Sequence, residues 1–415
     1  MSSKTFNPRP RKPHLFACLL VSESLSNPSR VRKVVTVSIT SQQMSSAQHS
    51  HQCVFAILHK RTKCNVYLSQ NSAFPQGNKS CRVFQTEDIA YDAFCDDFGP
   101  MNFSAIVRFI ETLDQQVDEA MFDENRSSVV YSSKDGPRGF TNASFLLGAY
   151  MLLKLKMSPE RVAKRFAKLD AALFEPYRDA SFHPPDFGLS LLDCWSGIYR
   201  AMREGWLARP TTRGSRVWGR INADEYAQYD DPLNADLHEV VPGRLVAFRT
   251  PRDLGGAAYR DAHGCVRHFA PSYFAPVLRE LGVSAVVQLN APCYDPAAFA
   301  AAGIAHHDLA WDDCPVPPLA TLRAFLAAAA AAPGAVAVHC ESGLGRTGTL
   351  IAVYMMKHHG FAAREAMGWL RVMRPGSVVG DQQHYLLAVE RRLREQGAGG
   401  GRGPCVSPAA PAAAA

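Results

Sequence analysis

The pattern of apolar and polar positions changes repeatedly between short apolar runs and longer segments with apolar side chains at helical spacing. The short runs predict buried strands at residues 53–59, 127–133, 284–290 and 335–340. The helical spacing predicts helices at residues 101–117, 141–157, 319–332 and 347–359. Strands that alternate with helices are typical of a mostly parallel sheet flanked by helices. The sequence therefore predicts an α/β fold with one such central sheet in each half of the chain.

Two segments share one plan, in which a buried strand leads through a glycine-bearing loop into an apolar helix. They are residues 129–152 and 336–358, and each helix carries a tyrosine near the same point. Unrelated strand–loop–helix units also look alike, so this alternative stays open. The pattern favours a distant internal duplication, with two tandem domains of the same type.

Composition indicates the remaining boundaries. Residues 1–50 are rich in Ser, Pro, Gln and basic side chains without a steady apolar period, and we expect a disordered basic tail there. Residues 397–415 form a low-complexity tail, and residues 69–81 have the composition of an exposed insertion. The polar, acidic segment 213–241 predicts a linker helix. The two domains are then expected at residues 51–212 and 242–396.

The distribution of charge argues against a nucleic-acid-binding fold. The formal net charge is +7, but residues 1–40 hold seven Lys or Arg against one acid, and Arg402 lies in the C-terminal tail. The rest of the chain is close to neutral, so only the tail is basic. No run approaches the ~18 apolar residues of a membrane span, because lysines interrupt residues 145–157.

The eleven cysteines are scattered and form no C-x-x-C pair. This usage is typical of free thiols in a reducing compartment and predicts no zinc site. Near the N terminus, a basic stretch followed by a short apolar run falls at the lower limit of a secretory signal. We therefore expect a cytoplasmic or nuclear protein.

The segment "VHCESGLGRTGTLIAVYMM", residues 338–356, contains a cysteine and an arginine separated by five residues. Its glycines allow a tight turn in which successive N–H groups point inward, and the following helix adds its positive end. Such a loop would bind phosphate oxygens. The residues expected to line it are Glu341, Ser342, Gly343, Leu344 and Gly345.

This loop also predicts a reaction. The positive field of the amides favours the thiolate of Cys340, which is the nucleophilic form of cysteine. Arg346 could hold two phosphoryl oxygens bidentately and follow them into the transition state. Amides and arginine meet the negative charge, so we expect no metal and no other cofactor. The alternative interpretation is a buried, inert cysteine beside an exposed arginine.

The signature "VHCESGLGRTGTL" resembles that of protein tyrosine and dual-specificity phosphatases, in particular the cell division cycle protein 14 family. Further segments resemble that family in order, and the resemblance covers roughly residues 50 to 395. They are "YDAFCDDFGPMN", "NASFLLGAYM", "EPYRDASF", "LLDCWSGI", "DEYAQYD", "VVPGRLVAF", "HHDLAW" and "RPGSVVGDQQHYL". The resemblance implies two dual-specificity-phosphatase-like domains joined by a helix, the first of them inactive. Ser132 and Ser133 stand where the first domain would need a cysteine.

Several roles follow from the residues and the resemblance together. A general acid must protonate the leaving alkoxide, and the family's aspartate 27 residues before the cysteine corresponds to Asp313, with Asp312 as the rival. Thr347 could donate its hydroxyl to the departing sulfur. Gln382 and Gln383 match the family's water-positioning loop, and His339 is expected to order the signature loop.

The linker acids have two interpretations. A run of acidic residues is ordinarily a solvated face. The resemblance instead implies phosphoserine substrates followed by proline, with a basic residue further on that docks against Glu225 and Asp230. We therefore expect phosphoprotein partners and a role in cell-cycle control.

The sequence departs from the family in two loops. Glu341 and Ser342 replace the usual Lys-Ala, residues 314–316 replace a glycine and small polar residues, and Asp381 replaces a proline. These changes put substrate affinity and substrate choice in question. Other functions remain open: a phosphoinositide phosphatase, a phosphotyrosine-only enzyme, or a phosphopeptide-binding pseudophosphatase scaffold.

Overall fold

The structure is a computed structural model that describes residues 52–58, 63–70, 81–122, 128–134, 136–181, 184–212, 214–262, 266–313 and 315–399. The tail predicted at 1–50, residues 71–80 of the predicted insertion, and residues 400–415 of the predicted C-terminal tail lie outside this part of the chain. The chain forms two compact units. The first contains residues up to 90, 108–151 and 155–175, and the second contains 91–107, 152–154 and everything from 176 onward.

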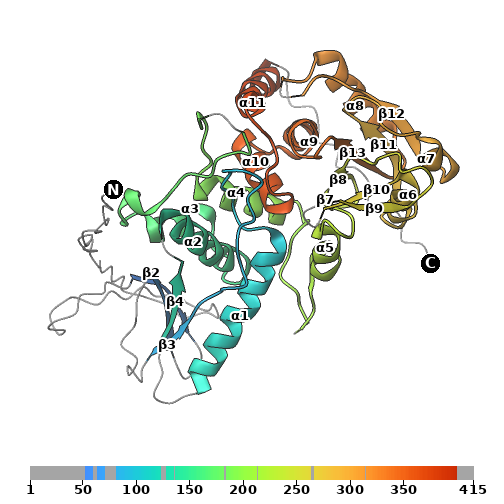
Figure 1. Ribbon diagram of the computed structural model, residues 1–415. Coiled ribbons are helices and arrows are strands. Elements are labelled where there is room, and N and C mark those ends of the chain that lie inside the picture. The colour runs from blue at the N-terminus through green and yellow to red at the C-terminus, as the bar shows by residue number, and fades with distance from the viewer. Residues whose placement is uncertain are drawn as a thin grey trace, which may run out of the picture. The chain divides into compact units, whose positions relative to one another are not determined.

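The first unit contains a four-stranded sheet with the strand order β1-β2-β4-β3. Figure 1 labels three of these strands, β2, β4 and β3. Central β4 pairs in parallel with both β2 and β3, whereas β1 pairs antiparallel with β2. The strands are β1 (Gln52–Leu58), β2 (Lys63–Gln70), β3 (Cys81–Phe84) and β4 (Ser128–Ser133). The helices are α1 (Phe103–Phe122), α2 (Gly136–Leu153) and α3 (Pro159–Phe166), with a short 3-10 turn at Ala171–Leu173.

Aromatic side chains join this sheet to α1. The ring of Phe109 on α1 lies 4.9 Å from that of Tyr131 on β4, and Tyr131 stacks on Phe84 of β3 at 5.0 Å. The Tyr131 hydroxyl is hydrogen-bonded to the Thr86 hydroxyl at 2.8 Å, so the buried phenol keeps a polar partner. Tyr150 of α2 donates to Asp114 of α1 at 2.9 Å, which fixes the two helices to each other.

The second unit contains a five-stranded sheet with the strand order β12-β11-β13-β8-β7. All neighbours are parallel except β7 and β8, which form an antiparallel pair at one edge. The strands are β7 (Leu237–Val241), β8 (Leu245–Arg249), β11 (Val283–Gln288), β12 (Ala305–Asp308) and β13 (Ala335–Cys340). A separate hairpin is formed by β9 (Tyr259–Ala262) and β10 (Val266–Phe269).

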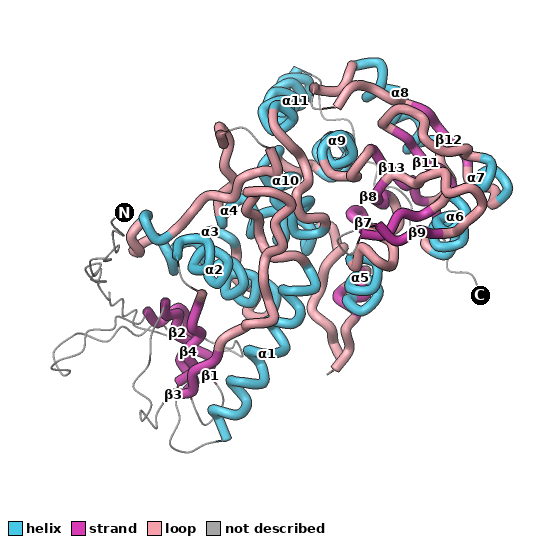
Figure 2. The backbone as a smooth tube through the Cα atoms, in the orientation of Figure 1, coloured by secondary structure: helices cyan, strands magenta, loops and turns pink. Residues whose placement is uncertain are grey.

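Helices cover both faces of this sheet, as the tube view also shows (Figure 2). One face carries α6 and α7, whose Phe274, Leu278 and Phe299 pack with Ala335 and Ala337 of β13 in one buried cluster. The other face carries α9, which contacts β13 and β8, and α10, which contacts β7. These helices are α6 (Pro271–Glu280), α7 (Ala297–Ala301), α8 (Leu319–Ala331), α9 (Gly345–His359), α10 (Ala363–Met373) and α11 (Asp381–Gly399).

The predicted fold class is confirmed, and the eight predicted strands and helices are present with boundaries shifted by up to five residues. The prediction of one helix over 213–241 is wrong in its extent. Only α5 (Ala223–Asp230) is helical, after a small hairpin of β5 (Val217–Trp218) and β6 (Ile221–Asn222). Gly219 between these strands has a φ of 68°, and Pro232 follows α5, so the chain cannot continue as one helix. Residues 237–241 belong to the sheet as β7.

Helix α4 (Leu191–Arg203) packs closely on α10 within the second unit. A Cβ at Gly197 would lie 2.5 Å from the carbonyl oxygen of Glu365, and one at Gly368 would lie 2.7 Å from that of Asp193. Glycine at both positions therefore allows the two backbones to touch. Asp193 also accepts from Arg364 at 2.9 Å across the same contact.

Candidate active site

The signature loop lies at the carboxyl end of β13, the central strand of the second unit's sheet. Cys340 is the last residue of β13 and is 2% exposed, residues 341–344 form the turn, and α9 begins at Gly345. All six residues of β13 are buried, because parallel neighbours flank it and helices cover both faces. The carboxyl end of a central parallel strand followed by a helix N-terminus is the position at which α/β folds bind anions.

The carbonyl groups of the loop accept hydrogen bonds from the surrounding protein. Thr250 N donates to Glu341 O at 3.2 Å, and the side chain of Arg374 donates to Ser342 O and to Gly343 O, both at 2.8 Å. Leu344 O accepts from the amides of Gly348 and Val378. The described peptide bonds are all trans, so the C=O of each residue and the N–H of the next point in opposite directions. The N–H groups of residues 342–345 are therefore directed away from these donors, which is the arrangement of an anion cradle.

Gly343 is required by the turn. Its φ is 71°, and a Cβ at this position would lie 2.1 Å from the carbonyl oxygen of Phe248 on β8. No side chain fits between the loop and the sheet there. The sequence prediction that glycine permits this turn agrees with the geometry.

Arg346 lies in the first turn of α9 and is 5% exposed. Its Nη1 donates to Trp311 O at 2.7 Å and to Leu289 O at 3.2 Å. Its Nε lies 3.1 Å from Oδ1 of Asp313, as an ion pair without hydrogen-bond alignment. The structure therefore brings the predicted acid Asp313 to the predicted phosphate-binding arginine. Asp312 is exposed.

Thr347 follows the arginine and is fully buried. Its hydroxyl has no hydrogen-bond partner among the residues that the structure describes. Leaving a buried hydroxyl unpaired costs about 1–3 kcal/mol. The protein without substrate bears this cost and keeps an unused hydrogen-bond donor at Thr347. This donor lies in the first turn of the helix that follows Cys340.

His339 is buried next to Cys340 and is hydrogen-bonded to a tyrosine. Its Nδ1 lies 3.4 Å from Cys340 O and its Nε2 lies 2.7 Å from the Tyr294 hydroxyl, which also contacts Nε2 of His306 at 3.0 Å. Burial lowers the pKa of His339 to about 3, so the ring is neutral at pH 7. The neutral ring therefore donates from Nδ1 to Cys340 O and accepts at Nε2 from Tyr294, and its role in ordering the signature loop stays a prediction.

The two predicted water-positioning glutamines differ in their surroundings, although both are buried. Gln383 accepts from Arg371 at 2.7 Å, and its amide donates to Gly380 O at 3.3 Å, so both ends of its side chain are occupied. The Gln382 side chain lies against the loop, with its Oε1 3.0 Å from the position of a Cβ at Gly345. Gln382 is therefore the one that contacts the candidate site.

The negative charge of Glu341, the residue that departs from the family pattern, is neutralised by a neighbouring arginine. Its carboxylate forms an ion pair with Arg252, and the Asn290 amide donates to it at 3.5 Å. The side chain is about half exposed and lies at the surface, as expected for a residue whose carbonyl faces the protein. Ser342 and Leu344 are partly exposed.

The two linker acids are placed differently. Asp230 ends α5, and both of its carboxylate oxygens have partners, since Oδ1 lies 2.8 Å from His238 Nε2 and Oδ2 accepts from Asn102 at 2.8 Å. Glu225 is exposed on α5 and lines a shallow hollow together with Tyr229 and Glu239. Of the pair, Glu225 is the acid whose side chain faces solvent.

The corresponding strand end in the first unit carries two serines in place of a cysteine. Ser132 and Ser133 are buried at the end of β4, where Ser132 accepts from Gln85 and Ser133 donates to Lys134 O. Helix α2 begins three positions after β4, whereas α9 begins five positions after Cys340. The first unit therefore lacks both the thiol and a loop of the length that forms the cradle.

Sequence reasoning missed three buried residues that support the site. Arg374 binds the loop carbonyls, Arg371 binds the glutamine loop through Ser377 O and Val378 O, and Tyr294 orders His339. The motif "RPGSVVGDQQ" contains Arg374 and could have suggested it, but its partners lie 31 to 138 residues away. Cys314, one of the substituted loop residues, lies outside the described residues.

Among the described residues, no group of His, Cys, Asp and Glu is suited to hold a metal ion. No described helix is long and apolar enough to cross a membrane.

A buried cysteine and arginine frame the loop between β13 and α9, and matches to two family models give the class of protein, the dual specificity phosphatases. Residues 62–201 match the family "Dual specificity protein phosphatase, N-terminal half", and residues 270–392 match "Dual specificity phosphatase, catalytic domain". The "Crystal structure of Tk-PTP in the active form" covers 38% of this chain and 97% of its own, with 25% identity and a TM-score of 0.30.

Curated relatives give the family. "Dual specificity protein phosphatase CDC14C" of Homo sapiens is 33% identical over 83% of this chain and 70% of its own length. CDC14AB of Danio rerio is 36% identical over 78% of this chain and 51% of its own, so the chain spans about half the length of this relative. "Tyrosine-protein phosphatase cdc-14" of Caenorhabditis elegans is 34% identical over 75% of this chain and 43% of its own. The chain belongs to the CDC14 family of dual specificity phosphatases, and the resemblance seen in the sequence is confirmed.

Proposed function

We propose that this protein is a phosphatase that acts on phosphoproteins through a cysteinyl-phosphate intermediate at Cys340. The observation that carries the proposal is the turn of residues 341–344, whose carbonyls are all bound by the protein so that the following amides face the opposite side. A phosphoryl group held by those amides would lie at the strand end that carries the buried thiol.

In the first step, the Cys340 thiolate attacks phosphorus, the S–P bond forms, and the bond from phosphorus to the seryl, threonyl or tyrosyl oxygen breaks. Asp313 gives its proton to the leaving oxygen. Its contact with Arg346 supports this role, because the same guanidinium would hold two phosphoryl oxygens. Asp312 remains the rival acid, but no such contact supports it.

In the second step, water attacks the phosphocysteine and the S–P bond breaks. Asp313 is now a carboxylate and takes the proton of that water. Gln382 positions the water through its amide. Gln383, whose side chain is bound to Arg371, supports the loop instead. The unpaired hydroxyl of Thr347 donates to the departing thiolate. Inorganic phosphate then leaves.

For substrate choice, we propose phosphoserine or phosphothreonine before proline, phosphotyrosine as well, and a basic residue further along the peptide. The exposed carboxylate of Glu225 supports an electrostatic preference of this kind. The internal bonds of Asp230 make it a weaker candidate for direct contact with substrate. We further propose that the first domain is inactive, since Ser132 and Ser133 end β4, and that the protein acts in cell-cycle control in the cytoplasm or nucleus.

The test is turnover of p-nitrophenyl phosphate and of a phosphopeptide array by the full chain, with vanadate as inhibitor. We expect turnover that vanadate suppresses and chelators leave unchanged. Cys340→Ser should abolish turnover yet still bind phosphopeptide, because the amides and Arg346 persist. Appreciable turnover by Cys340→Ser would exclude the covalent mechanism, and binding without turnover by the native protein would indicate a pseudophosphatase.

A further inference from the structure

The phosphate cradle is supported from behind by one buried arginine. Arg374 is 2% exposed and follows α10 directly. Its Nε donates to Gly343 O and its Nη2 donates to Ser342 O, both at 2.8 Å. Since the guanidinium is planar, its orientation fixes two consecutive peptide units, and with them the N–H groups of Leu344 and Gly343 on the opposite side.

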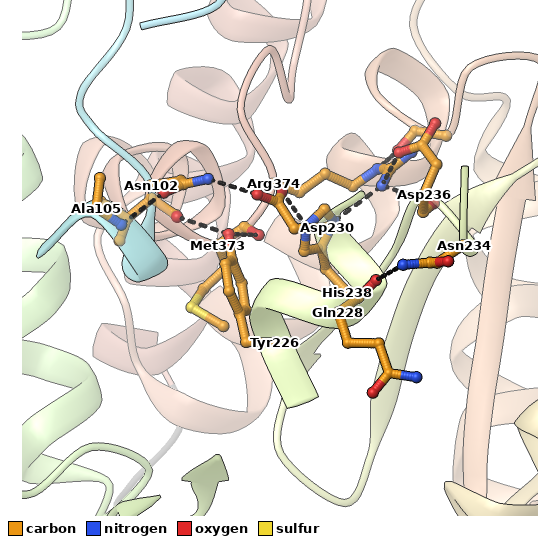
Figure 3. A network of polar contacts seen from close by, with 12 residues as sticks. Asn102, Ala105, Tyr226, Gln228, Asp230, Asn234, Asp236, His238, Met373 and Arg374 are labelled. Atoms are coloured by element: carbon orange, nitrogen blue, oxygen red, sulfur yellow. Dashed lines mark hydrogen bonds and ion pairs between the residues drawn. The ribbon is translucent and has the colours of Figure 1, made fainter. Parts of the chain in front are cut away.

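The remaining nitrogen of Arg374 is held by two residues before and within β7 (Figure 3). Nη1 has three acceptors, which share its two hydrogens: the carbonyl oxygen of Asp236 at 3.0 Å, the carboxylate of Asp236 at 2.9 Å and Nδ1 of His238 at 2.9 Å. Asp236 has a φ of 51°, a left-handed conformation that costs a non-glycine residue of order 1–3 kcal/mol. The carboxylate of Asp236 balances the buried positive charge.

The tautomer of His238 follows from these contacts. Arginine has only donors, so Nδ1 of His238 must accept from Arg374, and the ring hydrogen lies on Nε2. Nε2 therefore donates to Asp230 Oδ1 at 2.8 Å. The other oxygen of Asp230 accepts from Asn102, whose Oδ1 accepts from Ala105 N at the start of α1 (Figure 3).

We propose that Asp230, His238 and Arg374 form a positioning relay that sets the orientation of the cradle amides and hence the affinity of the site for phosphoryl groups. Asp230 then acts from within the protein on the catalytic loop. The inference rests on the proposed function only in that phosphate is taken as the ligand of the cradle. His238 and Arg374 are buried and touch neither the substrate nor the reacting atoms.

The probe is vanadate, whose binding to the full chain is measured by calorimetry and does not require turnover. His238→Leu removes both the acceptor for Arg374 and the donor to Asp230, and we expect vanadate Kd to rise about tenfold. Asp230→Asn keeps the shape of the side chain but places an amide N–H against one of its two donors, His238 or Asn102. We expect vanadate Kd to rise about threefold in this variant. His238→Gln, which can still accept and donate, should recover part of the loss.

Asp224→Asn is the matched control. Asp224 lies on the same helix, loses the same charge, and pairs at the surface with Arg216, away from the relay. A purely structural role would lower the melting temperature of the relay variants while leaving vanadate Kd unchanged, and that result would overturn the proposal. So would equal losses in Asp224→Asn and Asp230→Asn. If His238→Leu does not fold, Asp230→Asn decides alone.

The two proposals fail in different ways. A native protein that binds vanadate but hydrolyses no phosphate ester would refute the proposed enzyme and still report on the relay through Kd. A native protein that turns over substrate, with relay variants of unaltered vanadate affinity, would refute the relay alone. Absence of vanadate binding by the native protein would refute both.

Discussion

Substitution of Gly343 by alanine isolates the geometry of the cradle. The new methyl carbon would lie 2.1 Å from Phe248 O, whereas ordinary contact begins near 3.4 Å, so the loop and β8 must separate by about 1.3 Å. Phe248 is fully buried in the central sheet, where β8 pairs with β13, so we expect the loop to move. A displacement of about 1 Å at reacting groups can cost about 10²-fold in rate, or about 2.7 kcal/mol.

The chain offers a control with the same backbone conformation. Gly282 has a φ of 70° against 71° for Gly343, and a Cβ there would meet no atom within 4 Å. Both alanine variants carry the cost of a left-handed residue, roughly 1–2 kcal/mol, but only Gly343→Ala carries the collision. The assay is kcat/KM for p-nitrophenyl phosphate together with the melting temperature of each full-length variant. Equal kcat/KM for the two variants would refute this account of the cradle.

Three further predictions concern the acid, the buried histidine and the linker. Asp313→Ala should slow phosphoserine peptides by ~10²–10⁴-fold and aryl phosphates, with their better leaving group, much less; the same leaving-group dependence in Asp312→Ala alone would move the assignment by one residue. The pKa of His339 is about 3 in the folded protein and about 6.5 in the unfolded chain. As the pH falls from 6.5 toward 3, only the unfolded chain binds this proton, so the free energy of unfolding decreases. Urea denaturation at pH 7 and pH 5 should therefore differ by about 2 kcal/mol from this group, a difference that His339→Gln removes; an unchanged difference in that variant would contradict the assignment. Glu225→Lys should raise KM about tenfold, or about 1.4 kcal/mol, for peptides with a downstream base relative to neutral ones, and less at high salt; equal KM ratios before and after the change would show an ordinary surface charge.

What the sequence predicts correctly is what short-range pattern determines. The strand at 335–340 is a continuous apolar run because both of its faces are covered, and Cys340, Gly343 and Arg346 are close enough in sequence for one turn to bring them together. The same locality places Thr347 in the first turn of α9. The sequence alone does not separate Asp312 from Asp313, because the contact that favours Asp313 is with an arginine 33 residues away.

The features that escaped prediction depend on residues distant in sequence. His238 contacts Arg374 from 136 positions away, and Asp230 meets Asn102 from 128 positions away. The acidic composition of the segment does not indicate that the carboxylate of Asp230 is hydrogen-bonded within the protein. The linker was predicted as one helix because its polar composition hides β7, whose pairing with β8 comes from the sheet and not from local preference.

The close packing of α4 on α10 has a consequence for how the protein can be divided. Gly197 and Gly368 lie in opposite halves by family match, yet their helices touch backbone to backbone within one compact unit. Asp179, also from the first match, accepts from Gly380 N at 2.6 Å beside the glutamine loop. A fragment that starts at the second match would expose the α4-facing side of α10 and lose an anchor of that loop. Gene truncation or domain shuffling at the middle of this chain would therefore be expected to yield an insoluble or inactive fragment, which gives selection a reason to retain the N-terminal half.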